Sequence, residues 1–329
     1  MKNILLIGGT GFIGRHLIEA LNKDNHQLIL FSRQAPGFDL PPGVISIQGN
    51  RMQLKQYRQQ FEMFKPDVVV DLIPYTKQEA EGLLETFQGI TSHIVALSSG
   101  DVYQAYEIFH GGDGQVISSE LDENSALRTT MFPYRRPEQF NDWLYDYEKI
   151  HVEQILMGNS AIDVTILRLA ALYGEYDRQK KLSAYIQPML QEEDEILIPE
   201  HKANWRWTRA YVKDIVQAIV LSIEKEAARN EIFNVGAKKT YSQFEIIELL
   251  KALTGWKGDI VTIKQNIISD MPDDFEEELT KDEYNYGQHI VLNSQKIRDV
   301  LGYKEAYPYI VGLDRTITYE KSLEVKNED

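Results

Sequence analysis

Short apolar runs alternate with amphipathic segments along the first half of the chain. The runs are rich in valine, isoleucine and leucine, and they occupy residues 3–8, 27–32, 67–73, 92–99 and 161–174. Between them, residues 14–23 and 79–88 show the three- and four-residue spacing of a helix with one buried face. Buried strands that alternate with helices are typical of a parallel sheet covered on both faces. The pattern therefore predicts an α/β fold.

The pattern loosens after Gly174. Residues 213–225, 242–255 and 294–302 predict helices, and the acidic stretch 268–283 predicts a solvated loop or an exposed helix. The segment 212–235 still resembles part of a sheet, so we expect the two lobes to interleave. We predict a dinucleotide-binding domain over 1–174, joined by about 208–236, and a smaller substrate domain over 175–329.

Composition narrows the class of protein. The chain of 329 residues can bury a large core, and no run of eighteen apolar residues could span a bilayer. It has no cysteine, which excludes disulfides and thiolate metal sites, so we expect a cytoplasmic protein. The net charge of −15 opposes long-range attraction to phosphate backbones, so nucleic acid is not the expected partner.

A glycine loop follows the first apolar run directly and opens the first helix. It reads Gly8-Gly9-Thr10-Gly11-Phe12-Ile13-Gly14. Glycines permit the tight turn and let the backbone approach a pyrophosphate, whose charge then meets the amides of a helix N-terminus. A structural turn could use the same glycines, but this position favours nucleotide binding. The motif predicts a Rossmann-type doubly wound sheet, and all these residues except Gly9 are candidate cofactor contacts.

The end of the second run bears on the choice of cofactor. Ser32 and Arg33 stand where a site that prefers NAD usually has an acidic residue for the ribose diol. An arginine there can accommodate a 2′-phosphate instead, so we predict NADP in preference to NAD. The alternative is that Arg33 is only a solvated charge at a strand end.

Two further motifs carry proton-transfer chemistry. Ser98 and Ser99 end a buried run, at the sheet edge where ligands bind in such folds. In YDYEK, Tyr145 and Lys149 are four residues apart on a predicted helix, so we expect them on one face. The charge of the lysine would then lower the pKa of the phenol toward neutrality. The alternatives are a serine that ends a strand and an exposed helix pair.

With these motifs in this order, the chain resembles the short-chain dehydrogenase/reductase superfamily, in particular its extended branch of NAD(P)-dependent epimerases and dehydratases. Other family-like stretches include LRLAALYGEYD and EIFNVGAKKTYSQFEIIELLKALTG. The resemblance implies that Tyr145 is the catalytic acid or base, that Lys149 assists it and holds the nicotinamide ribose, and that Ser99 binds the substrate oxygen. It also implies cofactor contacts at Asn50 and Leu72, and a homodimer.

The chain departs from the family pattern on the substrate side. Gly100 and Asp101 replace the Asp-Glu pair of the 4,6-dehydratases, which disfavours that dehydration. Ala171 and Trp207 replace an asparagine and an arginine that contact the nucleotide diphosphate in family epimerases, which puts a standard nucleotide-sugar substrate in doubt. Neighbouring arginines could substitute, so the candidate substrate contacts are Asp101, Arg206, Trp207 and Arg209.

An insertion follows the strand-end serines and contributes several arginines. Residues 105–143 hold glycines, prolines, Arg128, Arg135 and Arg136, which predict either a lid that selects an anionic substrate or a surface excursion. The seven histidines form no close pair, and no Ser-His-Asp pattern stands out. We therefore predict neither a metal site nor a hydrolytic triad.

Two functions of different classes follow. The first is an NAD(P)-dependent epimerase or reductase/dehydrogenase that acts on a hydroxyl or carbonyl carbon of a small sugar or sugar-like substrate. The second is an RNA-binding or nucleotide-sensing protein, because the N-terminal half also resembles an atypical branch that includes chloroplast stem-loop RNA-binding proteins. The negative charge and the Ser99, Tyr145 and Lys149 set favour the enzyme.

Overall fold

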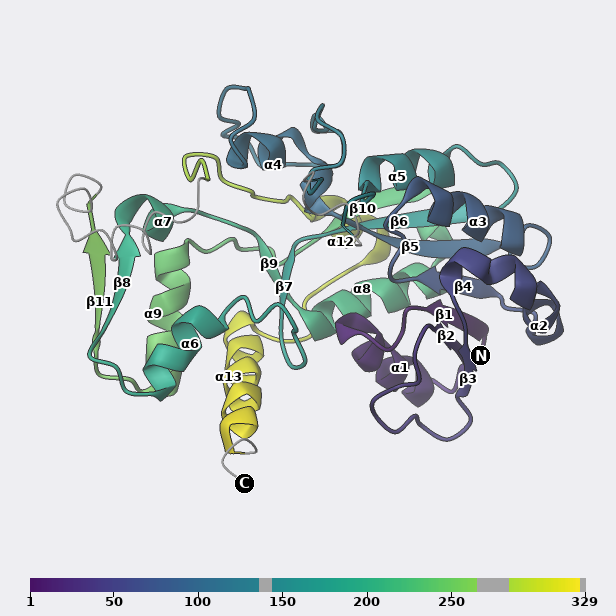
Figure 1. Ribbon diagram of the computed structural model, residues 1–329, viewed down its shortest axis with the longest axis horizontal. Helices are drawn as coiled ribbons and strands as arrows, with labels where there is room; N and C mark the ends of the chain where they lie inside the picture. Colours follow the sequence, from purple (N-terminus) through teal and green to yellow (C-terminus); the bar gives the residue numbers. More distant parts are fainter. Residues whose placement is uncertain (136–143, 265–283, 326–329) are drawn as a thin grey trace.

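The centre of the protein is a seven-stranded parallel sheet (Figure 1). The computed structural model describes residues 1–135, 144–264 and 284–325. The predicted acidic stretch 268–283 lies outside them. In spatial order the strands are β10 (Glu231–Val235), β6 (Asp163–Leu169), β5 (His93–Ser99), β4 (Val68–Asp71), β1 (Asn3–Ile7), β2 (Gln27–Ser32) and β3 (Ile45–Gln48). This order confirms the predicted Rossmann-type fold.

Helices cover both faces of the sheet, because the strand side chains alternate between two apolar clusters. Helices α1 (Phe12–Lys23), α8 (Val212–Glu224) and α12 (Gln295–Leu301) pack on one face. The other face is covered by η1 (Arg51–Tyr57), α2 (Arg58–Phe64), α3 (Lys77–Phe87) and α5 (Lys149–Met157). In β1, Leu6 points into the first cluster and Leu5 into the second, and both are fully buried. Burial on both faces explains why the strand is a continuous apolar run.

A smaller lobe lies beside the sheet, on the left in Figure 1. It contains α6 (Ser183–Leu190), α7 (Glu200–Asn204), α9 (Gln243–Thr254) and α13 (Tyr309–Val325). Its short strands pair in parallel: β7 (Ala171–Tyr173) with β9 (Arg209–Tyr211), and β8 (Glu195–Pro199) with β11 (Asp259–Ile263). A separate apolar cluster holds this lobe together.

The two lobes interleave along the chain. After β6 the chain enters the smaller lobe, then returns through α8 to add β10 beside β6. The remaining short helices are η2 (Gly100–Val102), α4 (Gln104–Phe109) and η4 (Glu226–Ala228). The first two follow β5, so they stand at the carboxyl edge of the sheet. The numerical domain boundaries stay a prediction.

Candidate functional site

In the glycine loop, backbone conformation or close packing requires glycine at Gly8 and Gly14, whereas the space beside Gly11 is open. Gly8 has a φ of +85°, and a Cβ on Gly14 would lie 2.4 Å from the backbone of Gly9. A Cβ on Gly11 would meet only the Gly8 carbonyl oxygen, at 3.7 Å. Gly11 caps α1 without a side chain, and the first turn has no acidic residue. The open backbone and the free helix N-terminus fit the pyrophosphate of a dinucleotide.

The other predicted contacts around this loop occupy the same edge. Thr10, Gly11 and Phe12 line a cavity of about 280 Å³, together with Phe38 from the loop after β2. Ile13 packs against the cores of both lobes. The loop after β2 thus lies beside the glycine loop.

The predicted cofactor contacts at the ends of β2, β3 and β4 have mixed environments. The buried Ser32 hydroxyl donates to the Gln34 carbonyl oxygen at 2.7 Å, while Arg33 is exposed. The Asn50 side chain caps η1 by accepting the Met52 N–H at 3.0 Å, and Leu72 is buried after β4. The roles of these four residues stay predictions, and only Arg33 presents an exposed charge.

A second cavity, of about 420 Å³, opens at the carboxyl end of β5. Its polar lining includes Ser99, Asp101, Tyr106, Tyr134, Tyr147 and Trp207. Elements far apart in sequence meet here, because Ile290 and Leu292 close the side next to Trp207 and Gly100. The cavity combines one carboxyl group with several phenols at the edge where such sheets bind ligands.

Tyr145 lies outside the helix that was predicted to carry it. Helix α5 begins at Lys149, and Tyr145 occupies the turn before it. The Arg135 guanidinium lies 4.7 Å from the centre of the Tyr145 ring, and its Nε donates to the Tyr145 carbonyl oxygen at 3.1 Å. The prediction that Tyr145 and Lys149 share one face of a helix is therefore wrong. The catalytic role of Tyr145 stays a prediction.

Tyr147 is the phenol of this motif that faces the cavity. It is 6% exposed, and its hydroxyl donates to Oδ2 of Asp101 at 2.7 Å. Burial, followed by the charge of Asp101, raises the pKa of Tyr147, while a hydrogen bond with Ser99 lowers it. Tyr147 was not among the residues predicted from the sequence. The presence of two tyrosines within YDYEK was a signal that either one could face the cavity.

Lys149 is buried behind the phenols. Its Nζ donates to the carbonyl oxygens of Pro74 and Leu97, both at 2.8 Å, and lies 5.7 Å from the centre of the Tyr147 ring. Burial lowers the pKa of Lys149 to about 8, and the charge of Asp101 acts in the opposite direction. The lysine therefore links the ends of β4 and β5 next to the cavity. Ser99 caps η2 by accepting the Asp101 N–H at 3.2 Å.

The predicted substrate contacts on the smaller lobe differ in their partners. Arg206 pairs with Glu245 at 2.9 Å, whereas Trp207 lines the larger cavity. Arg209 is 6% exposed and donates to Gln243 at 2.6 Å, and its Nε has no hydrogen-bond partner. Burial lowers the pKa of Arg209. Within residues 1–135, 144–264 and 284–325, no carboxylate forms an ion pair with Arg209.

The two arginines of the insertion that the structure describes, Arg128 and Arg135, each pair with an acid. Arg128 forms a buried ion pair with Glu148, the residue that caps α5, and its Nε donates to the Asp101 carbonyl oxygen at 3.0 Å. Arg135 pairs with Asp146 at 2.9 Å. Arg136 lies outside the described residues. Arg128 therefore joins the insertion to the start of α5 and to the main chain at Asp101, while the lid and the surface excursion both stay predictions.

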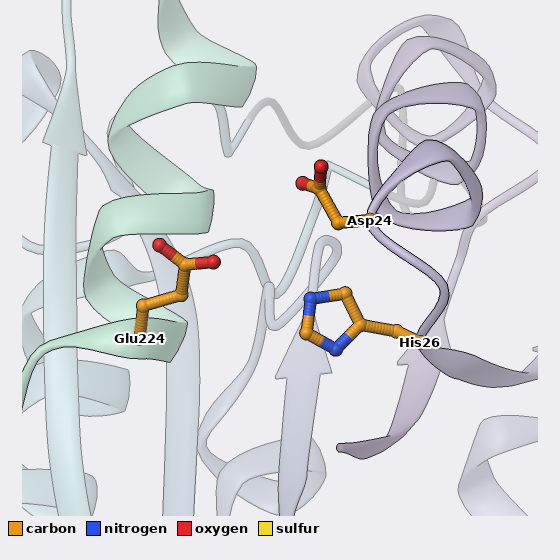
Figure 2. Close-up of side chains that lie close together, drawn as sticks. All are labelled: Asp24, His26 and Glu224. Atoms are coloured by element: carbon orange, nitrogen blue, oxygen red, sulfur yellow. The ribbon is translucent and has the colours of Figure 1, made fainter. Parts of the chain in front are cut away.

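Three side chains of the types that ligate metal ions lie close together, away from the carboxyl edge of the sheet. Asp24, His26 and Glu224 place ligand atoms within 4.8 Å of one another at the C-terminal ends of α1 and α8 (Figure 2). His26 Nδ1 accepts the Lys2 N–H at 3.2 Å, so the neutral ring carries its proton on Nε2. Figure 2 shows that this second nitrogen faces the carboxylates. A protonated nitrogen offers no lone pair, so the cluster gives no support for a metal site.

Among the described helices, none is both long and apolar enough to cross a bilayer.

Comparisons with known proteins agree with the fold and identify the family. Residues 4–236 match the model of the NAD dependent epimerase/dehydratase family. The chain is 23% identical over 325 residues to the chloroplast stem-loop binding protein of 41 kDa b of Arabidopsis thaliana, covering 95% of this chain and 77% of that protein. It is 22% identical over 272 residues to a putative UDP-glucose 4-epimerase of Methanocaldococcus jannaschii, covering 78% and 84%.

Solved structures show the same fold over nearly the whole chain. The UDP-glucose 4-epimerase of Thermotoga maritima, in a structure with UDP-glucose, superposes with a TM-score of 0.72 and 20% identity. The match covers 98% of this chain and 99% of that one. At this identity the likeness shows a shared fold.

Proposed function

Because the chain belongs to the NAD dependent epimerase/dehydratase family, we propose that it is an NAD(P)-dependent epimerase or oxidoreductase of a sugar-like substrate. The observation that carries this proposal is the cavity of about 420 Å³, where Ser99, Asp101 and Tyr147 meet at the carboxyl edge of the sheet. A bound nicotinamide supplies the hydride acceptor or donor. Ser99 and Tyr147 then bind the substrate oxygen, and Tyr147 moves its proton.

A side-by-side titration of the purified protein with NADH and NADPH tests this proposal. Nicotinamide fluorescence reports binding, after the preparation has been checked for retained cofactor. We expect at least one dinucleotide to bind, and replacement of Gly11 by valine to abolish binding by filling the open backbone position. A protein that binds neither and retains none would lack the cofactor on which the proposed chemistry depends.

We also propose that Arg33 favours NADPH over NADH. Its guanidinium is exposed directly after β2, the position from which an arginine contacts the 2′-phosphate of NADP in this class of fold. A hydrogen bond to a charged group contributes about 1.5–3 kcal/mol, so Arg33→Ala should weaken NADPH binding by roughly tenfold or more. NADH, which lacks the phosphate, is the internal control. Equal loss for both cofactors would refute the preference.

Substrate recognition is proposed to involve Trp207 and two cations beside its ring. Lys181 Nζ lies 5.1 Å from the ring centre, Arg209 Cζ lies 5.8 Å from it, and Lys181 lines both cavities. Burial lowers the pKa of each cation. A substrate anion near Trp207 would be stabilised by these charges. Lys181 was not among the predicted contacts, because it lies in a loop without a motif.

RNA binding remains the second candidate, because a relative that matches 95% of this chain is named a stem-loop binding protein. The net charge of −15 opposes it. A salt-dependent gel shift with structured RNA that survives Tyr147→Phe would favour this alternative.

The homodimer stays a prediction.

A further inference from the structure

Asp101 differs from three buried carboxylates that lie at the end of β4 and along α5. Asp71, Glu148 and Glu153 are each held by an arginine through two or more hydrogen bonds. Asp101 is 4% exposed, and in the part of the chain that the structure describes no cation forms an ion pair with its carboxyl group. Arg128 donates a hydrogen bond to the main-chain oxygen of Asp101, although its charge also acts on the carboxyl group. Burying a carboxylate without a paired cation destabilises the folded protein. A role in the chemistry of the site would explain why Asp101 is placed there.

Phenols surround this carboxyl group instead. Oδ2 accepts hydrogen bonds from Tyr147 at 2.7 Å and from Tyr134 at 3.1 Å, and the Tyr134 hydroxyl lies 2.8 Å from that of Tyr106. Oδ1 is buried and has no partner. The residue also lines the larger cavity, so its carboxyl group lies at the edge of the space that a substrate would occupy.

The phenolic proton of Tyr147 therefore points at a carboxylate and not toward an amine. Within the described residues, Lys149 donates its hydrogen bonds to the main-chain oxygens of Pro74 and Leu97. A carboxylate accepts a proton readily when its surroundings disfavour its charge, and burial raises the pKa of Asp101.

Resting on the proposed function, we propose that Asp101 is the proton acceptor for Tyr147 during oxidation of a substrate hydroxyl. The substrate O–H bond breaks as its proton passes to Oη of Tyr147, while the phenolic proton passes to Oδ2 of Asp101. The electron pair left on the substrate oxygen forms the carbonyl as the carbon loses hydride, for which a bound oxidised nicotinamide would supply the acceptor. Reduction runs the same transfers backward.

The proposal predicts that Asp101 controls the ionisation of Tyr147. Among the described residues, the groups that act on this pair are Tyr75, Ser99, Tyr106, His110, Arg128, Tyr134, Lys149 and Lys181. In protein labelled with ¹³C at tyrosine Cζ, the Tyr147 resonance is assigned from its loss in Tyr147→Phe. We expect Asp101→Asn to move the titration of Tyr147 to lower pH by roughly one unit or more, because it removes a negative neighbour.

Asp146→Asn is the matched control, since that acid lies one residue from Tyr147 but pairs with the exposed Arg135. It should leave the Tyr147 titration unchanged. If Asp101→Asn also leaves it unchanged, the assignment of Asp101 is wrong. If that variant does not fold, the Tyr147 resonance of unsubstituted protein must show a step at the pH where a ¹³C-labelled Asp101 carboxyl titrates; a missing step overturns the proposal.

These measurements need no cofactor, so two failures are distinguishable. An uncoupled Tyr147 in a protein that binds NADH or NADPH would refute only the role of Asp101. A coupled pair in a protein that binds neither dinucleotide would refute the proposed enzyme. Once a substrate is identified, Asp101→Asn should also shift the pH profile of turnover, which a merely structural residue would not do.

Discussion

Tyr147→Phe should lower turnover by about a thousandfold, a typical contribution of a positioned proton donor or acceptor. Of the two tyrosines in YDYEK, Tyr147 is the one that lines the cavity and donates to Asp101, so its hydroxyl is placed to exchange a proton with a substrate oxygen. Tyr145→Phe should retain activity within a few-fold, because the ring of Tyr145 packs against Arg135 in the turn before α5. The measurement is turnover of the sugar derivative that a screen of the wild-type protein identifies.

Binding of NADH or NADPH is the control for both variants, and neither should change it by more than a few-fold. An inactive Tyr145→Phe beside an active Tyr147→Phe would contradict this assignment. It would mean that α5 gains a turn when ligands bind, which would bring Tyr145 and Lys149 onto the helical face predicted from their spacing.

Arg128→Met should reduce the free energy of unfolding by about 3–5 kcal/mol, the usual cost of leaving one partner of a buried ion pair without the other. Glu148 is fully buried and accepts from Arg128 and from the N–H groups of Phe132 and Ile150. Removing the arginine leaves its charge uncompensated. Urea denaturation followed by circular dichroism measures the change.

Arg135→Met is the matched control, since its pair with Asp146 is solvent-exposed and should contribute at most about 1 kcal/mol. Adding Glu148→Gln to Arg128→Met should recover part of the lost stability by removing the unpaired charge. Equal effects of the two arginine substitutions, or no recovery in the double variant, would show that the buried pair is not the support described here.

Most of the sheet was predictable, because its inner strands are buried on both faces and appear as continuous apolar runs, whereas the edge strand β3 is mostly exposed and was not predicted. Runs such as 67–73 and 92–99 alternate with amphipathic segments, which favours interior strands, and the φ of +85° at Gly8 favours a glycine. The position of the candidate site was also predictable, because ligands bind at the carboxyl ends of the strands in sheets of this kind.

The arrangement within the site was less predictable, because long-range contacts determine it. Helix α5 begins at Lys149, where Glu148 serves as its cap and pairs with Arg128, twenty residues earlier. A spacing of four residues cannot reveal that partner. Tyr134 likewise reaches Asp101 from an insertion whose sequence has no regular period.

The return of the chain to complete the sheet has a consequence for its synthesis. While the ribosome is still making residues 170–230, β6 is an unpaired edge whose side chains from Val164 to Leu169 are all apolar or buried in the finished protein. Such an edge invites pairing with other nascent chains. A fragment that stops at Gly174 would keep this edge permanently, so we expect it to aggregate, and the full-length chain to depend on chaperones until β10 emerges.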